Sequence, residues 1–113
     1  MAKRLSGTTI DPDLSRSQIV PAGEEITGFN QRRFRADVEL AAAHSLLVVA
    51  DLTQTRRLDR WGFLTLFDLH ERLRPRLVLV APDDIRRAVR RLDPLGTLPT
   101  FSTVDEFRAL QKM

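Results

Sequence analysis

The sequence predicts a single α/β domain with elements in the order β-α-β-α-β-α-β-α. The chain has 113 residues, the usual size for one hydrophobic core. Two apolar runs, 46–52 and 76–82, lack polar alternation, which is typical of parallel strands buried on both faces. Segments with helical periodicity lie between and after these runs, so they supply the crossover connections of a parallel sheet.

The first half of the chain adds one strand and one helix. Residues 17–20 are expected to form a short strand that Pro21 ends. Residues 30–44 are expected to form a helix, with Asn30 as its N-cap. The apolar face of this helix consists of Phe34, Val38, Ala41 and Ala42.

The second half continues the alternation. Residues 61–74 form the helix between the two buried strands, which completes a right-handed βαβ unit. Residues 83–92 form the next helix, and Asp83 and Asp84 complement its dipole. Its buried face is expected to consist of Ile85, Ala88, Val89 and Leu92.

A short strand at 98–101 and a final helix complete the domain. Pro99 indicates that this strand lies at an edge of the sheet. Thr103 and Glu106 have the spacing of a capping box at the start of the final helix, whose buried face is expected to include Phe107 and Leu110.

Residues 1–16 are rich in polar and turn-forming residues, so they are expected to be a loose N-terminal segment or one edge strand. Residues 17–113 are expected to form the domain itself. Its predicted architecture is a mixed sheet of four to five strands with about four helices.

The composition excludes several classes of site. Cysteine is absent, so disulfides, thiolate zinc sites and thiol nucleophiles are excluded, and a reducing cytoplasm is expected. No apolar run approaches the roughly 20 residues that span a bilayer, and the N-terminus lacks the apolar core of a signal peptide.

The net charge of +3 comes almost entirely from arginine, which is spread over every predicted helix. We interpret this as a solvated surface, because a nucleic-acid footprint gathers cations on one face and interleaves aromatic residues. An arginine-mediated nucleic-acid binder stays a third hypothesis.

No constellation of catalytic or metal-binding residues is visible. His44 and His70 lie inside predicted helices with no nucleophile or second ligand at suitable spacing, and no phosphate-binding glycine loop occurs. Asp51 lies at the end of a buried strand, where an open α/β sheet presents a site. It is interpreted either as a site residue or, preferably, as an acceptor for loop amides. We therefore expect no enzyme, no metal and no cofactor.

In the central segment a buried strand ends at Asp51-Leu52, a polar loop follows at 53–57, and the turn 58–62 opens an amphipathic helix. This pattern resembles the STAS domain, the fold of bacterial anti-sigma factor antagonists. The resemblance extends over residues 17–112. It implies a cytoplasmic, non-catalytic regulator of transcription (an anti-anti-sigma factor) that binds an anti-sigma factor kinase or another STAS protein, with a homodimer as a further option.

One departure from the family pattern concerns the switch. Regulatory members carry a phosphorylated Ser or Thr just before the turn glycine, whereas Trp61 stands there and Arg60 replaces the preceding Ser. The resemblance therefore implies a contact surface without a phosphoacceptor at that point. The residues expected to bind the partner are Thr53, Thr55, Asp59, Arg60, Trp61 and Gly62.

The sequence leaves two questions open. Trp61 is either an exposed anchor for a partner or part of the core beneath the N-terminal segment. The domain is also open to a second interpretation as a small-ligand module for a nucleotide or lipid, with its pocket at the end of the central strand.

Overall fold

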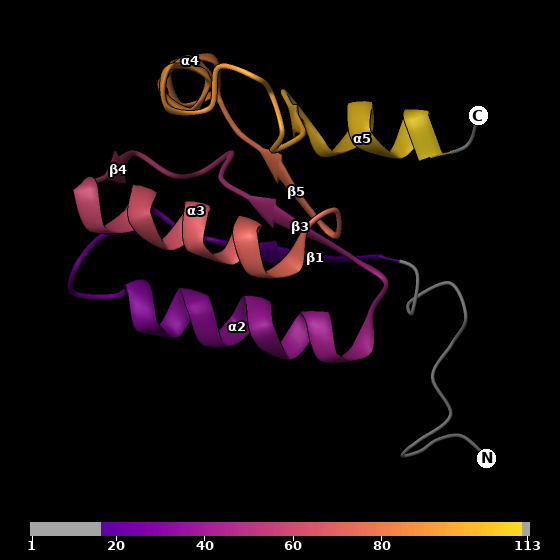
Figure 1. Ribbon diagram of the computed structural model, residues 1–113, viewed down its shortest axis with the longest axis horizontal. Coiled ribbons are helices and arrows are strands. Elements are labelled where there is room, and N and C mark those ends of the chain that lie inside the picture. Colours follow the sequence, from indigo (N-terminus) through magenta and orange to yellow (C-terminus); the bar gives the residue numbers. More distant parts are fainter. Residues whose placement is uncertain (1–16, 112–113) are drawn as a thin grey trace.

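A sheet of four parallel strands lies at the centre of the computed structural model, which describes residues 17–111 (Figure 1). In spatial order the strands are β1 (Ser17–Pro21), β3 (Leu47–Asp51), β5 (Leu77–Val80) and β6 (Thr100–Phe101). The helices that alternate with them are α2 (Gln31–His44), α3 (Arg60–Leu73), α4 (Asp83–Leu92) and α5 (Val104–Gln111). The predicted α/β class and element order are confirmed.

The order of the strands explains how the helices are distributed. Strand order follows chain order, so successive right-handed crossovers place α2, α3 and α4 on the same face of the sheet. One core cluster joins Phe34 of α2, Leu66 of α3 and Val89 of α4 to that face, whereas Phe107 of α5 packs against Val49 on the other. Among the described strands the order does not reverse, so these strands form no switch-point crevice of the kind that holds dinucleotides.

A second, smaller parallel pair was not predicted. It consists of β2 (Glu25–Ile26) and β4 (Arg57–Leu58). Each of these strands follows the carboxyl end of a main-sheet strand. The pair therefore ties the loop after β1 to the loop after β3, and two segments far apart in the sequence form one surface.

The expected mixed sheet is not seen in this part of the chain, since every strand pair within residues 17–111 is parallel. The possible N-terminal edge strand at 1–16 lies outside the described residues. β6 is an edge strand, as Pro99 indicated. Pro21 is the last residue of β1 rather than its terminator, and it is tolerated because β1 has a partner on one side only within the described sheet.

Two apolar residues predicted for buried helix faces are exposed. Leu92 is 61% exposed and Leu110 is 50% exposed. Each lies in the last turn of its helix, and neither packs against a core cluster. By contrast Ile85, Val89 and Phe107 are buried as predicted.

The two predicted caps differ in outcome. Asn30 occupies the N-cap position of α2 without capping it, because its Oδ1 accepts from the backbone N–H of Thr27 (2.7 Å) and its Nδ2 donates to the Glu25 carbonyl (2.7 Å). Its side chain thus shapes the preceding loop. At α5 the Thr103 hydroxyl accepts from the N–H of Glu106 at 2.9 Å, as a capping box requires.

Candidate functional site

The turn that opens α3 is held by the carboxylate of Asp59. Its Oδ1 accepts from the backbone N–H of Gly62 at 2.9 Å, as an N-cap does, and its Oδ2 accepts from the N–H of Gly28 at 3.1 Å. The Gly62 N–H lowers the pKa of Asp59 most, and the Gly28 N–H lowers it further. One ionised side chain therefore joins the turn 58–62 to the loop before α2.

Gly62 is required by close backbone packing. A Cβ at this position would lie 2.1 Å from the carbonyl oxygen of Ile26 and 2.6 Å from Cδ1 of Leu58. Ile26 is fully buried in β2, so its backbone has little freedom to retreat. The first turn of α3 is thus in close contact with the backbone of β2, and this contact determines how the neighbouring side chain of Trp61 is placed.

Three large apolar side chains stand exposed around this junction. Phe29 is 101% exposed, Trp61 is 59% exposed and Leu64 is 52% exposed. A Cβ on Gly28 would lie 3.1 Å from Cδ1 of Trp61, so the loop that carries Phe29 runs directly beside the indole. Leu64 lies one turn after Trp61 on the same helix face. We call Phe29, Trp61 and Leu64 the apolar patch.

The apolar patch presents about 400 Å² of surface, if each aromatic ring offers roughly 150–250 Å² when fully exposed. Patches of this size on a monomer often mark interaction sites. Trp61 is exposed in the described structure, and the alternative of burial beneath the N-terminal segment concerns residues 1–16, which lie outside it. Phe29 also borders a surface hollow of about 280 Å³ together with Arg57, Leu58 and Asp59.

Arginine residues occupy the first turns of α2 and α3, where the helix dipole favours acidic side chains. Arg32 lies in the first turn of α2 and Arg60 opens α3, and neither first turn contains an acidic residue. The first turns of α4 and α5 each contain two acidic residues. A misplaced charge of this kind costs about 0.3–1 kcal/mol. Natural sequences break such local rules mainly at functional sites.

The other predicted site residues divide into exposed and buried groups. Thr53 is exposed, but its hydroxyl and its N–H both donate to Oδ1 of Asp51, at 2.7 and 2.9 Å. This confirms the preferred interpretation of Asp51 as an acceptor for loop amides. Thr55 is buried and its hydroxyl donates to the Gly23 carbonyl at 2.8 Å. Thr55 and Gly62 are both buried, and their part in partner binding stays a prediction.

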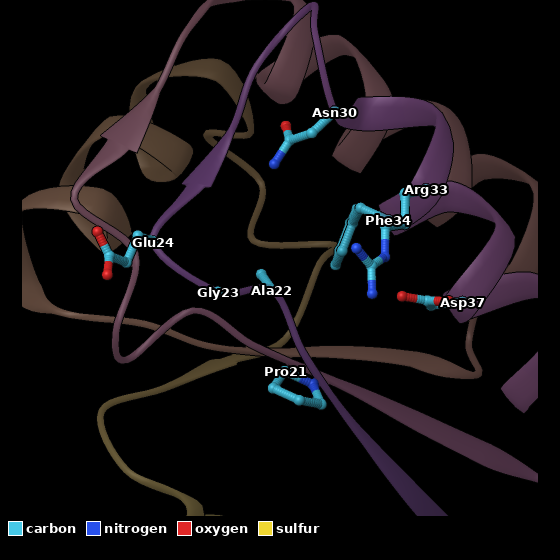
Figure 2. A pocket seen from close by; sticks show the side chains of 8 residues that line it. All are labelled: Pro21, Ala22, Gly23, Glu24, Asn30, Arg33, Phe34 and Asp37. Atoms are coloured by element: carbon cyan, nitrogen blue, oxygen red, sulfur yellow. The ribbon is translucent and has the colours of Figure 1, made fainter.

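A second hollow of about 310 Å³ lies at the carboxyl end of β1 (Figure 2). Arg33 and Asp37 of α2 form one wall, and Pro21, Ala22 and Gly23 form another. Its volume is at the lower limit of small-molecule pockets, which are mostly apolar. It does not lie at the end of the central strand β3, where the ligand hypothesis placed it.

The buried histidine belongs to a structural cluster. His70 Nε2 lies 3.2 Å from the hydroxyl of Thr97, and Asp93 accepts from that hydroxyl at 2.8 Å and from the N–H of Leu98 at 2.8 Å. These contacts hold the loop between α4 and β6. Within residues 17–111 no three His, Cys, Asp or Glu residues gather as a metal site requires.

Comparisons with known proteins support the architecture. No protein-family model and no curated protein match the sequence. Among solved structures, an anti-sigma factor antagonist from Mycobacterium paratuberculosis superposes with a TM-score of 0.72, at 21% identity, over 86% of each chain. The chain therefore has a STAS-like fold, as the resemblance implied. None of the helices within residues 17–111 has the length and apolar character to cross a bilayer.

Sequence reasoning missed Phe29 and Leu64. Phe29 lies in a loop, where no periodicity marks it. Leu64 falls within an apolar helical run, and only the packing of α3 decides which of its residues face outward. A lone aromatic residue between Gly28 and Asn30, in an otherwise polar loop, was the one available signal for Phe29.

Proposed function

We propose that this protein is a non-catalytic regulatory domain that binds a protein partner through the apolar patch and the turn 58–62. The exposure of Trp61 is the observation that carries the proposal, because a single domain gains nothing for its own stability by holding half of its only tryptophan in water. Tryptophan is among the residues most enriched at interface hot spots.

The fold supports a regulatory role of this kind. The structural neighbour is an anti-sigma factor antagonist, and a partner for the present chain would be an anti-sigma factor kinase domain or another STAS-like protein. We propose that binding takes place in the cytoplasm and controls transcription.

The turn is proposed to act without phosphorylation at its centre. Neither Arg60 nor Trp61 has a hydroxyl, and Asp59 already places a negative charge on the N–H groups of Gly62 and Gly28. A phosphate here would add about −1.5 to −2 charges beside that carboxylate. The nearest hydroxyl in the first turns of α3 is that of Thr65, which is buried and donates to Gln31 Oε1 at 3.0 Å. The binding surface thus has one chemical state at this point.

The test is partner capture with matched alanine variants. Tagged wild-type protein is used as bait in the native host, beside Trp61→Ala and the control Leu92→Ala, which removes a similarly exposed apolar side chain from α4. We expect a specific partner to be retained by the wild type and by Leu92→Ala and lost from Trp61→Ala. Equal retention by all three folded proteins would refute the proposed surface.

A ligand-binding function is the second candidate, favoured only by the hollow of about 310 Å³ at the end of β1. Binding to the native state raises the melting temperature. A thermal-shift panel of nucleotides and lipids would reveal such a ligand, and substitution of Arg33, which lines the hollow, should remove the shift.

A further inference from the structure

The charged side chains in the first turns of α2 and α3 are all cationic. Arg32 and Arg60 are exposed, and within residues 17–111 neither has an ion-pair partner. Arg57, which borders the same hollow as Phe29, lies 3.6 Å from Glu25, but its side chain is 77% exposed and the pair is correspondingly weak.

The acidic side chains of Asp59 and Asp68 already have hydrogen-bond or ion-pair partners. Both oxygens of Asp59 accept backbone N–H groups, and Asp68 pairs with Arg35 at 2.5 Å and with Arg72 at 3.7 Å. These ion pairs continue the α2–α3 seam away from the apolar patch. The patch end of the seam therefore carries Arg32 and Arg60 without ion-pair partners against the one carboxylate of Asp59, whereas the cations at the far end are paired.

The helix dipoles add to this charge. α2 and α3 both begin beside the apolar patch, since Gly28 contacts Trp61 and Gln31 bonds to Thr65. Both helices thus begin at the end of the molecule that carries Arg32 and Arg60. Asp59 caps α3, whereas α2 has no side-chain cap and no acidic residue in its first turn, so the dipole of α2 adds positive potential there. Such a combined field attracts carboxylates and repels a second surface of the same kind.

We propose that the apolar patch docks an acidic segment of a partner protein, whose apolar side chains cover Phe29 and Trp61 and whose carboxylates pair with Arg32 and Arg60. This inference rests on the proposed function and adds the chemistry of the partner. A second copy of the chain fits less well, because a two-fold contact through the patch would set two surfaces with the same excess of arginine against each other.

The first experiment identifies the contacted segment directly. The photo-crosslinking residue p-benzoylphenylalanine replaces Phe29 in one protein and Leu95, an exposed residue of the loop after α4, in a control. After irradiation in the native host, the peptide joined to position 29 is sequenced by mass spectrometry. We expect one partner segment that contains at least two Asp or Glu residues and large apolar residues, and that is absent from the control.

The second experiment measures the contribution of charge. Purified partner is titrated with wild-type protein, with the double variant Arg32→Glu and Arg60→Glu, and with the control Arg87→Glu on the exposed face of α4. We expect the double variant to bind at least about tenfold more weakly at low salt, with the difference narrowing as salt rises, and the control to bind normally.

The outcomes separate this inference from the proposed function. A crosslinked partner segment without carboxylates, or normal binding by the double variant, overturns the acidic-partner inference and leaves the proposed function standing. Crosslinking to no protein overturns both. Crosslinking to a second copy of the chain overturns the inference that the partner is a different protein. A blue shift of Trp61 emission with vesicles of 70% phosphatidylcholine and 30% phosphatidylserine, removed by Phe29→Ala, assigns the apolar patch to an anionic lipid surface instead.

Discussion

Substitution of Gly62 by alanine tests the packing that positions the candidate site. The new Cβ would lie 2.1 Å from the carbonyl oxygen of Ile26, whereas ordinary contacts begin at 3.4 Å. α3 or β2 must therefore move by more than an ångström. Overpacking of this severity costs about 3 kcal/mol, and the better helix propensity of alanine returns about 1 kcal/mol. We expect a net loss of about 2 kcal/mol.

This loss converts into a measurable change in melting temperature. Unfolding entropy of about 2.1 cal/mol/K per residue gives roughly 0.24 kcal/mol/K for a chain of 113 residues, so Gly62→Ala should melt about 8 °C below the wild type. The matched control is Gly28→Ala, whose Cβ would meet only the exposed indole of Trp61 at 3.1 Å. We expect that variant to melt within about 2 °C of the wild type. A Gly62→Ala protein as stable as the control would refute this account of the turn.

Three further predictions concern stability, acid and fluorescence. Arg76 donates to the carbonyls of Ala42, Ser45 and Leu46 at the end of α2, so Arg76→Ala should lower the free energy of unfolding by about 2 kcal/mol in urea titrations, with Arg76→Lys restoring only part of it. Burial raises the pKa of Asp93, but hydrogen bonds from the N–H of Leu98 and from Thr97 outweigh it and lower the pKa overall. The stability that Asp93 contributes is therefore present above about pH 3.9 and is lost as the pH falls further. The melting temperatures of the wild type and Asp93→Asn should therefore converge in acid. A difference in melting temperature that stays constant from pH 6 to 3 would contradict this. The single tryptophan should emit at the long wavelength of a hydrated indole in the free protein, and a blue-shifted maximum there would mean that Trp61 is covered.

Much of the fold could be predicted because its signals are local. The uninterrupted apolar runs that become β3 and β5, and the acidic start and apolar spacing of α4, determine these elements within a few residues of chain. The capping box of α5 follows from side chains that bond to their own turn.

The remainder depends on contacts between distant segments. β2 and β4 have two residues each, which is too short for any periodicity, yet their pairing brings Phe29 beside Trp61. Asn30 has the right type and position for a cap, but the Thr27 N–H is the nearer partner. The exposure of Trp61 could not be decided from sequence either, because an amphipathic helix of 14 residues does not reveal which neighbours cover its first turn.

The affinity of the isolated partner for Phe29→Ala tests the central claim most directly. Phe29 is fully exposed, so its removal should leave the fold and the melting temperature unchanged. If the apolar patch is the docking surface, the loss should reach about 2 kcal/mol, which is an affinity about 30-fold weaker, while Leu95→Ala binds like the wild type. Equal affinities for the wild type, Phe29→Ala and Leu95→Ala would contradict the account.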